Sequence, residues 1–486
     1  MANVKPSSRR RQWLAFSAVA LGTFCSVMDH GSISVALPSI SEHFSANIPT
    51  TQWIVIVFSL TIVMLLLPMS RLGDTNGLTS IYRLGCVILV FATLTAGISP
   101  SLMVLIGARV VQGVGAAMTQ GIGMAIVVSV FPQGERGKAI GLIMTTVGAG
   151  AIAGPAFGGI LVDWFGWRAV FLGNVPLLSV SLILAIFAIG NISPGRRTSE
   201  SAQQAFDWPG ALLSSLAVLV IMMLATNFQR LASQPILLFV LILSGFVLII
   251  AFIYRESRCN SPMFKLDLFT NGVFSWGVLS AFLMFVGSSG VLFLTPFYLQ
   301  EVLLFSPKIS GLTVVPGAFC MTILGVVSGR LSDKFGWGRF TLLGLCLSAS
   351  GLWILSFLMV DSPLVHVISG LVLHSCGMGI FYSPNSSAIL SASGQANQGL
   401  ASGMVNLVRN SGSIVSVALA TGVVTLSMAG MGFEPSLDAV RGAEIIGINE
   451  AFVTGLQWAY RTLGTLIVFS LFCSVLQIRQ SQRTSD

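Results

Sequence analysis

The sequence predicts an all-α membrane protein that crosses the bilayer many times. Of its 486 residues, 54% are hydrophobic and only 9% are charged, and the mean hydropathy is +0.88. Soluble domains carry about 25% charged residues, so this composition excludes a soluble fold. A transmembrane helix needs about 20 mostly apolar residues, and the chain contains fourteen stretches of that kind.

The fourteen predicted spans alternate in direction, and an even number places both ends of the chain on one side of the membrane. We expect them at 13–37, 51–70, 80–98, 101–130, 138–163, 169–190, 208–227, 236–254, 272–300, 309–330, 340–360, 363–392, 399–428 and 451–476.

The basic residues indicate which side that is. The segments on the side of the termini hold 18 of the 25 Lys and Arg residues, the opposite loops hold four, and Arg109, Arg409 and Arg461 fall within spans. Cytoplasmic loops of membrane proteins carry an excess of Lys and Arg. We therefore expect both termini in the cytoplasm and the chain in the inner (plasma) membrane. This placement accounts for the net charge of +8 without a nucleic-acid partner.

Several chemical classes find no support in the sequence. The seven cysteines are scattered singly, which indicates neither a disulfide framework nor a metal site. The chain lacks the G-x-x-x-x-G-K-[ST] phosphate loop, so transport driven by ATP hydrolysis is not indicated. It also shows no convincing set of catalytic residues. We expect a transporter that is not an enzyme and has no cofactor.

An internal repeat relates two parts of the chain. Ser70–Gly77 follows the second predicted span and Gly329–Gly336 follows the tenth, and both contain R-L-small-D-x-x-G in what we expect to be a short cytoplasmic loop. Two six-span halves related in this way are a common plan of transporters.

The repeat predicts three parts of the chain. We expect an N-terminal six-helix bundle over 1–190, a C-terminal six-helix bundle over 272–486, and cytoplasmic linkers with two inserted spans over 191–271.

The fifth predicted span contains a dense run of glycines, Gly148–Gly159 (GAGAIAGPAFGG). Gly150, Gly154 and Gly158 recur every four residues around Pro155, which strips one helix face of side chains and lets a second helix approach closely. Proline bends the helix. We expect this face to seal the two bundles against each other, and ordinary tight packing of a membrane helix is the alternative.

Taken together, the motifs resemble the major facilitator superfamily, and within it the fourteen-span drug:proton antiporters. The resemblance covers almost the whole chain and implies two six-helix bundles that rock around a central cavity. It rests on the loop motif G-x-L-a-D-r-x-G-r-k at Gly329–Arg339 and more loosely at Ser70–Thr79, the first-span motif at Asp29–Ile40, the fourth-span motif at Leu105–Ala117, the fifth-span antiporter motif at Gly148–Gly159, and the W-R-x-x-F-x-x-N-x-P signature at Trp167–Pro176.

The resemblance assigns a gating role to the two loop motifs, which would latch the outward-facing state. An Asp at such a turn can receive the positive N-terminal end of a neighbouring helix, whereas a solvated loop charge is the alternative. The first copy departs from the pattern at Ser70, Leu78 and Thr79. The residues concerned are Asp74, Gly77, Arg330, Asp333, Gly336 and Arg339.

Charged residues inside spans cost about 2.5–3.5 kcal/mol on insertion scales, so each is a functional candidate. Asp29 is the only acid that we place deep within a span, about 12 Å below the outer end, and Arg109 lies about 10 Å deep in the fourth span. An apolar cavity favours the protonated carboxyl, whereas a nearby guanidinium favours the carboxylate. This competition would let Asp29 load and release a proton; a permanent structural ion pair is the alternative.

Other polar residues are candidates for the substrate cavity. His30 can line the pore only at the edge of one helix face, as a relay or as a packed histidine, and Gln112 lies one turn from Arg109. The candidates in the C-terminal half are His374, Asn406, Arg409 and Arg461. The two arginines are compatible with an anionic substrate, and burial in polar packing is the alternative.

The C-terminal spans contain no deep acid, and we expect Glu301 at the surface. In the family that the chain resembles, exporters of dications tend to carry a second deep carboxylate. The resemblance therefore favours monovalent or neutral amphiphiles.

We predict a monomeric, proton-driven antiporter that exports amphipathic small molecules (multidrug efflux) by alternating access in a lipid bilayer, with the proton gradient as its energy source. Three alternatives stay open: a dedicated exporter of one endogenous metabolite such as a siderophore or antibiotic, an importer by proton symport, and a sensor or scaffold without transport. The antiporter-type pair Gly154-Pro155 argues against the importer.

Overall fold

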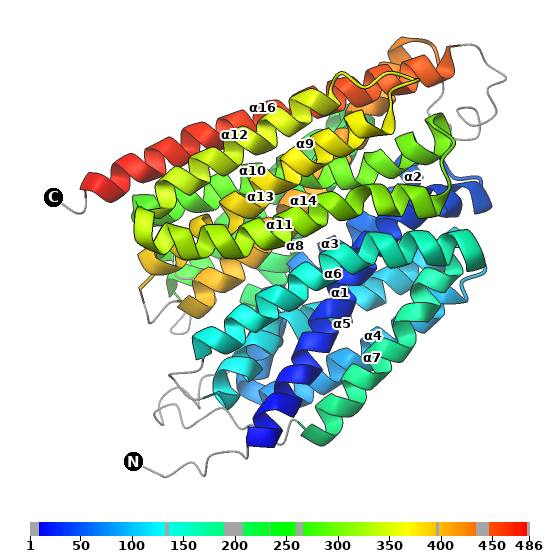
Figure 1. Cartoon of the computed structure of the whole chain (residues 1–486). Helices are drawn as coiled ribbons and strands as arrows, with labels where there is room; N and C mark the ends of the chain where they lie inside the picture. Colours follow the sequence, from blue (N-terminus) through cyan, green and yellow to red (C-terminus); the bar gives the residue numbers. More distant parts are fainter. Residues whose placement is uncertain are drawn as a thin grey trace, which may run out of the picture.

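The computed structural model describes residues 9–131, 136–188, 208–232, 234–258, 266–394, 398–433 and 447–483. Long helices make up nearly all of this part of the chain (Figure 1). They are α1 (Arg9–His43), α3 (Trp53–Asn76), α4 (Leu78–Gly97), α5 (Leu102–Val130), α6 (Arg136–Phe165), α7 (Arg168–Ala188), α8 (Trp208–Ala232), α9 (Pro235–Arg258), α10 (Gly272–Phe297), α11 (Pro307–Phe335), α12 (Trp337–Leu355), α13 (Leu364–Ala392), α14 (Gln398–Gly430) and α16 (Ile448–Arg483), with the short turns α2 (Ile48–Thr51), η2 (Leu266–Thr270) and η3 (Tyr298–Val302) between them.

Each predicted span coincides with one of these long helices. Within the described residues, thirteen helices are long and apolar enough to cross a membrane. The remaining one is α8, whose apolar part runs over Trp208–Leu224. The prediction of an all-helical protein with many spans is confirmed. Much of the expected linkers, 189–207 and 259–265, lies outside the described residues.

The helices form two bundles that lie side by side. In the first, α1 packs on α6 and α7, while α5 packs on α3 and α4; in the second, α13 packs on α11 and α12, while α10 packs on α14 and α16. Figure 1 shows the first bundle in blue to cyan below the second in green to red. Apolar side chains along these helices supply the core, because nearly every helix is apolar over most of its circumference.

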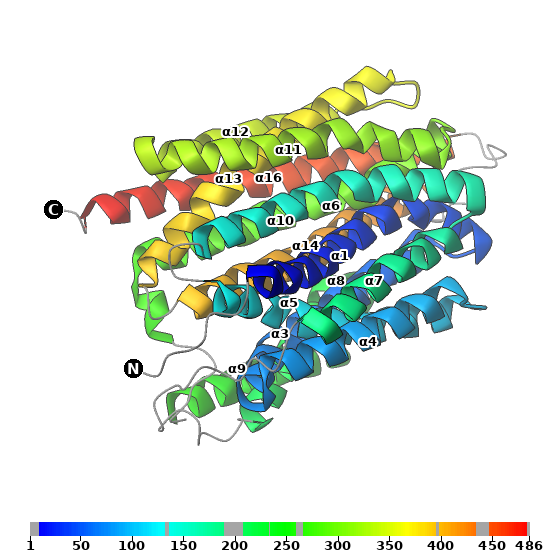
Figure 2. The same ribbon diagram turned by 60° about the horizontal axis from the view of Figure 1, so that its bottom comes forward.

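The two bundles meet mainly along α6 and α11 on one side and along α3 and α14 on the other. In both views the α6 and α11 ribbons converge at the end away from the termini and diverge toward the end where both termini lie (Figures 1 and 2). Helix α8 packs on both α3 and α14, and α9 packs mainly on α8. Only 6% of the apolar span of α9 is buried, so this helix presents its side chains to lipid.

Both copies of the repeated motif end a helix in the same way. Gly77 (φ +98°) and Gly336 (φ +84°) lie in the left-handed region that glycine adopts without strain. Their N–H groups donate to the carbonyls of Gly73 and Ser332 at 3.0 Å, and the next helix begins one residue later. This corrects the expectation of a loop: the residues before each glycine form the last turns of α3 and α11, because a single glycine is enough to redirect the chain.

Candidate functional site

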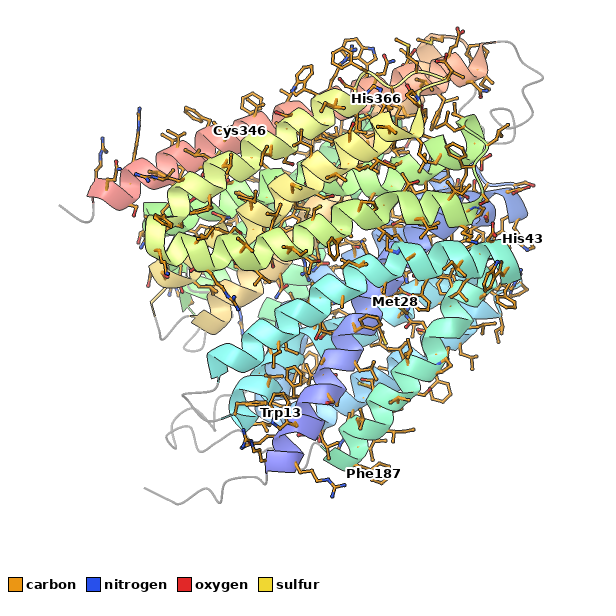
Figure 3. All side chains as sticks on the ribbon, in the orientation of Figure 1. Trp13, Met28, His43, Phe187, Cys346 and His366 are labelled. Carbon is orange, nitrogen blue, oxygen red and sulfur yellow. The ribbon has the colours of Figure 1, made fainter. Side chains whose placement is uncertain are left out.

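A buried ion pair joins α1 to α5 in the first bundle. The Arg109 Nη1 atom lies 2.8 Å from Asp29 Oδ2, and 1% and 2% of the two side chains are exposed. Figure 3 shows Met28, the residue before Asp29, about midway along α1 between Trp13 and His43. The two residues that the sequence places at similar depth therefore contact each other, in a part of the protein that excludes water.

Gln112 joins both members of the pair. Its Oε1 accepts a hydrogen bond from Arg109 Nη1 at 2.8 Å, and its Nε2 donates to Asp29 Oδ1 at 3.3 Å and to Thr93 Oγ1 at 3.1 Å. Both carboxylate oxygens of Asp29 thus accept a hydrogen bond, one of them from a cation. Hydrogen bonds that involve an ionised group are about twice as strong as neutral ones. This network fixes the relative position of α1, α4 and α5 at mid-helix.

Helix α3 holds the other side of the guanidinium. Arg109 Nε donates to the Ile54 carbonyl at 3.1 Å, and the guanidinium carbon lies 4.1 Å from the centre of the Phe58 ring. The Nη2 atom of Arg109 has no hydrogen-bond partner among the described residues, and an unpaired buried donor costs about 1–3 kcal/mol. Residues of α1, α3 and α5 therefore contact the guanidinium, while its Nη2 atom lacks a hydrogen bond within the described residues.

His30, the residue after Asp29, lies beside Phe58 of α3. It is half-buried, its ring centre lies 6.2 Å from that of Phe58, and Arg409 of α14 is among the charged groups near it. Adjacent residues of a helix point about 100° apart. Consequently Asp29 can point into the first bundle while His30 lies at the boundary between the two.

The glycine stripe of α6 packs against the part of α1 that carries Asp29. A Cβ at Gly154 would lie 2.7 Å from the Met28 carbonyl oxygen, and a Cβ at Gly158 would lie 2.8 Å from Ser32 Cβ. The Ser32 hydroxyl donates to the Gly154 carbonyl at 2.7 Å. Only glycine permits this approach, so α6 contacts the backbone of α1 on both sides of Asp29.

A different face of α6 contacts the second bundle. A Cβ at Gly159 would lie 2.6 Å from the Pro307 carbonyl oxygen, Gly148 faces Thr322, and a Cβ at Gly311 would overlap the Pro155 carbonyl. At 3.6 residues per turn, the positions that face α11 lie about 120° around the helix from the stripe that faces α1.

This geometry corrects one expectation. Gly150, Gly154 and Gly158, which we expect from their spacing to seal the bundles, pack within their own bundle. Gly148 and Gly159 make the contact with the second bundle, together with Gly311 of α11. Spacing shows which positions share a face of a helix, but it does not show which neighbour that face meets.

The bundles also meet at the end of the protein opposite the termini. Gln300 Nε2 donates to the Val35 carbonyl of α1 at 3.0 Å and to Ser310 Oγ at 3.3 Å. Glu301 is 4% exposed, not at the surface as we expect from the sequence. Beside these residues lies a cavity of about 280 Å³, lined by Ser39, Glu42, Gln300, Glu301, Leu304, Phe305, Ser306 and Pro307.

The structure separates the predicted cavity residues of the second bundle. His374 is 5% exposed and its Nδ1 lies 2.8 Å from Ser348 Oγ, so its ring is held between α12 and α13. Asn406 and Arg409 are half-buried on one side of α14, and the Asn406 carbonyl accepts a hydrogen bond from Asn410 Nδ2 at 2.9 Å.

Arg461 is half-buried at the edge of the second bundle. Its guanidinium carbon is 5.0 Å from the ring centre of Trp458 and 6.0 Å from that of Phe357, and these rings are 53% and 60% exposed. Phe357 follows the end of α12, so Arg461 lies near the end of the bundle and not at mid-depth. Aromatic residues and arginine are typical of the membrane–water interface. This corrects the assignment of Arg461 to the substrate cavity.

The gating residues are described in part. Arg330 and Arg339 are exposed, whereas the side chains of Asp74 and Asp333 lie outside the described part of the structure. Near the first motif, Arg83 donates to the Ala185 and Ile186 carbonyls at 3.1 Å and 3.0 Å, at the end of α7. A cation there satisfies carbonyls that have no partner within the helix.

Sequence reasoning missed three partners of the site. Thr93 and Phe58 hold the Asp29–Arg109 network, and Gly311 completes the contact between α6 and α11. The pair Ser310-Gly311 near the start of a span is a small-residue signal that could have indicated Gly311. The roles of Phe58 and Thr93 follow only from how α3 and α4 pack around α5.

Comparisons with known proteins agree with this architecture. The Major Facilitator Superfamily model matches residues 19–417. Riboflavin transporter RibZ of Clostridioides difficile is 28% identical over 444 residues, which cover 91% of this chain and 94% of that protein. The tetracenomycin C resistance and export protein of Streptomyces glaucescens is 29% identical over 484 residues, which cover 96% of this chain and 88% of that protein.

A solved structure has the same fold. A bacterial homologue of the human lysosomal transporter Spinster, in an inward-facing and occupied conformation, aligns with a TM-score of 0.70 at 17% identity, covering 98% of each chain. The family match extends over most of the sequence, and these relatives are transporters, not enzymes. The chain belongs to the Major Facilitator Superfamily of membrane transporters.

Proposed function

We propose that this protein is a proton-coupled antiporter that exports amphipathic small molecules, and that it belongs to the fourteen-span drug:proton branch of its family. The observation that carries the proposal is the buried network of Asp29, Arg109 and Gln112. Asp29 is the only acid that the predicted spans place deep in the membrane. Ionisable residues at that depth are expensive and typically mark proton or ion pathways.

Protonation of Asp29 would remove one charge of the pair. Arg109 would then keep the Ile54 carbonyl, the Gln112 side chain and the Phe58 ring as partners. These contacts matter because removing one charge of a buried ion pair leaves the other charge uncompensated, which costs about 3–5 kcal/mol. Asp29 can therefore change its charge state without leaving Arg109 unsolvated.

Helix α6 would couple that charge state to movement of the bundles. One of its faces contacts the backbone of α1 next to Asp29, and another contacts α11 in the second bundle. When the bundles rock, α6 must slide on one of these faces or carry α1 with it. Packed interfaces of this kind switch between discrete arrangements and do not deform continuously.

The proposed membrane orientation rests on the excess of Lys and Arg on the side of the termini. With both termini in the cytoplasm of a cell whose inner membrane holds the protein, the packed end of α6 and α11 is extracellular and the diverging end is open to the cytoplasm. The two bundles, 1–190 and 272–486, are the moving halves, and α8 and α9 within 191–271 are inserted spans on one side. Two bundles in a single chain suffice for this movement, so a monomer is expected.

Two other functions remain candidates. The relative from Streptomyces glaucescens is named for resistance to and export of one antibiotic, which supports a dedicated exporter of one metabolite. The relative from Clostridioides difficile is named a riboflavin transporter, a name that fits either direction of transport, so a proton-symport importer also has a basis.

The experiment that tests the proposal measures proton movement across reconstituted vesicles. Vesicles with an acidic interior and a pH-sensitive dye receive tetracenomycin C or riboflavin from outside, with empty vesicles as the control. Export by antiport predicts that substrate uptake releases protons from the vesicle. Proton movement in the same direction as the substrate would indicate a symporter, and substrate uptake without proton movement would contradict proton coupling.

A further inference from the structure

Arg409 carries a positive charge inside the membrane-spanning part of α14. It lies six residues after Gly403, where the apolar span of this helix begins, which is about 9 Å along the helix axis. The side chain is half-buried. A guanidinium at such depth is costly unless it is paired or reaches a polar cavity, so a partner for its charge is needed.

The described part of the protein supplies none. Arg409 makes no hydrogen bond or ion pair with any described residue. Asp29 is already bound by Arg109 and Gln112. The other acids of the second bundle whose side chains are described lie at helix ends or in connections: Asp267, Glu301, Asp361 and Glu450.

The other two arginines that the sequence places in spans are accounted for. Arg109 is paired with Asp29, and Arg461 lies over two exposed aromatic rings at the edge of the second bundle. Arg409 is therefore the one arginine of this set that has neither a carboxylate nor an aromatic ring as partner within the described ranges.

Arg409 belongs to α14, the helix of the second bundle that packs on α3 of the first. Its guanidinium lies near His30 of the first bundle, and Asn406 lies one turn earlier on the same side of α14. The Asn406 side chain makes no hydrogen bond with a described residue. The polar groups along this part of the boundary thus include a guanidinium, an imidazole and an amide, all able to donate hydrogen bonds, whereas the nearby carboxylate of Asp29 is already paired.

We propose that the transported molecule carries an anionic group, such as a carboxylate or phosphate, which pairs with Arg409 at the boundary between the two bundles. Arginine suits this role because its planar guanidinium can form two parallel hydrogen bonds to a carboxylate or phosphate. This inference rests on the proposed transport function and adds the charge of the substrate to it. It excludes permanent cations as preferred substrates.

The test compares three fluorescent probes that share the dansyl group and differ in charge. They are dansyl-phenylalanine (an anion), dansyl-phenylalaninamide (neutral) and dansyl-cadaverine (a cation), titrated by fluorescence anisotropy against the full-length protein in phosphatidylcholine nanodiscs. A hydrogen bond to a charged group corresponds to about tenfold or more in affinity. We expect wild-type protein to bind the anion at least about tenfold more tightly than either of the other probes.

Variants assign the preference to Arg409. Arg409→Gln should remove the advantage of the anion, and Arg409→Glu should reverse it in favour of dansyl-cadaverine. Arg461→Gln is the matched control, because it removes a half-buried arginine of the same bundle that lies beside two exposed aromatic rings. It should leave all three affinities unchanged.

Equal binding of the three probes by wild-type protein, or binding of none, would overturn the proposal, and so would an anion preference that survives Arg409→Gln. These results do not depend on proton movement, so they are distinct from failure of the antiporter proposal. Phosphatidylglycerol added to the nanodiscs identifies the source of the anion. Displacement of dansyl-phenylalanine by this lipid supports an anion site occupied by a lipid headgroup, and unchanged binding supports a site for a soluble anion.

Discussion

Gly154 of α6 lies directly against the backbone of Met28 in α1, where a Cβ would come within 2.7 Å of the Met28 carbonyl oxygen. The next residue of α1 is Asp29, whose carboxylate is paired with Arg109. A second face of α6 packs equally closely, because Gly159 of the same helix lies against Pro307 of α11. Helix α6 therefore connects the seam between the bundles, where α6 packs on α11, to the buried carboxylate of Asp29.

Replacing Gly154 by Val should disrupt this connection. The new side chain meets backbone atoms that cannot move aside, and overpacking of this kind costs about 1–3 kcal/mol. We expect a lower thermal unfolding temperature in detergent and loss of substrate-driven proton release in vesicles. Gly107→Ala in α5 is the control, because a Cβ at Gly107 meets no atom within 4 Å. Wild-type transport by Gly154→Val would show that the close contact is dispensable.

The Gly311→Ala substitution should disturb the seam where α6 packs on α11. A Cβ there overlaps the Pro155 carbonyl, so the added methyl group pushes α6 and α11 apart at the end away from the termini. Spin labels at Thr50→Cys in the first bundle and Leu304→Cys in the second would report this separation. We expect a longer mean distance in Gly311→Ala and an unchanged one in Gly430→Ala, where a Cβ meets no atom. Equal distances in both variants would contradict the role of the α6–α11 contact in closing this end of the protein.

The sequence located the helices well, because apolar runs of the right length have few other uses. It could not show which partner each helix face meets, as the glycine stripe of α6 demonstrates. Glu301 is buried because η3 (Tyr298–Val302) is a π-helical turn, whose extra residue shifts the side chains away from the faces that α-helical spacing predicts. Arg461 appeared deep because α16 continues for 36 residues, well beyond the length that crosses a bilayer.

Gln300 is predicted to hold the end away from the termini closed. Its amide bridges to the Val35 carbonyl of the first bundle. Gln300→Leu keeps a similar volume but loses the hydrogen bond, a net change of about 0.5–1.5 kcal/mol. We expect the same spin-label pair to show a larger open fraction, by about two- to tenfold. No change in this fraction would mean that the seam of α6 and α11 closes this end alone.

A double-mutant cycle separates a structural ion pair from a proton-coupling one. Asp29→Asn and Arg109→Gln should each lower stability, the second by about 3–5 kcal/mol because it leaves a buried carboxylate unpaired. The double variant should regain stability, since two neutral amides can pair. We expect it to remain inactive in proton release. Recovery of both stability and transport would assign the pair a purely structural role.

The most direct test of the account is substrate-triggered proton release from vesicles that contain Asp29→Asn. Asp163→Asn is the matched control, since Asp163 is an exposed carboxylate near the end of α6. The account predicts that Asp163→Asn releases protons like the wild type. It predicts that Asp29→Asn releases none, although the same amount of folded protein is present in the membrane. Proton release by Asp29→Asn at the wild-type rate would contradict the central claim that this carboxylate carries the exchanged proton.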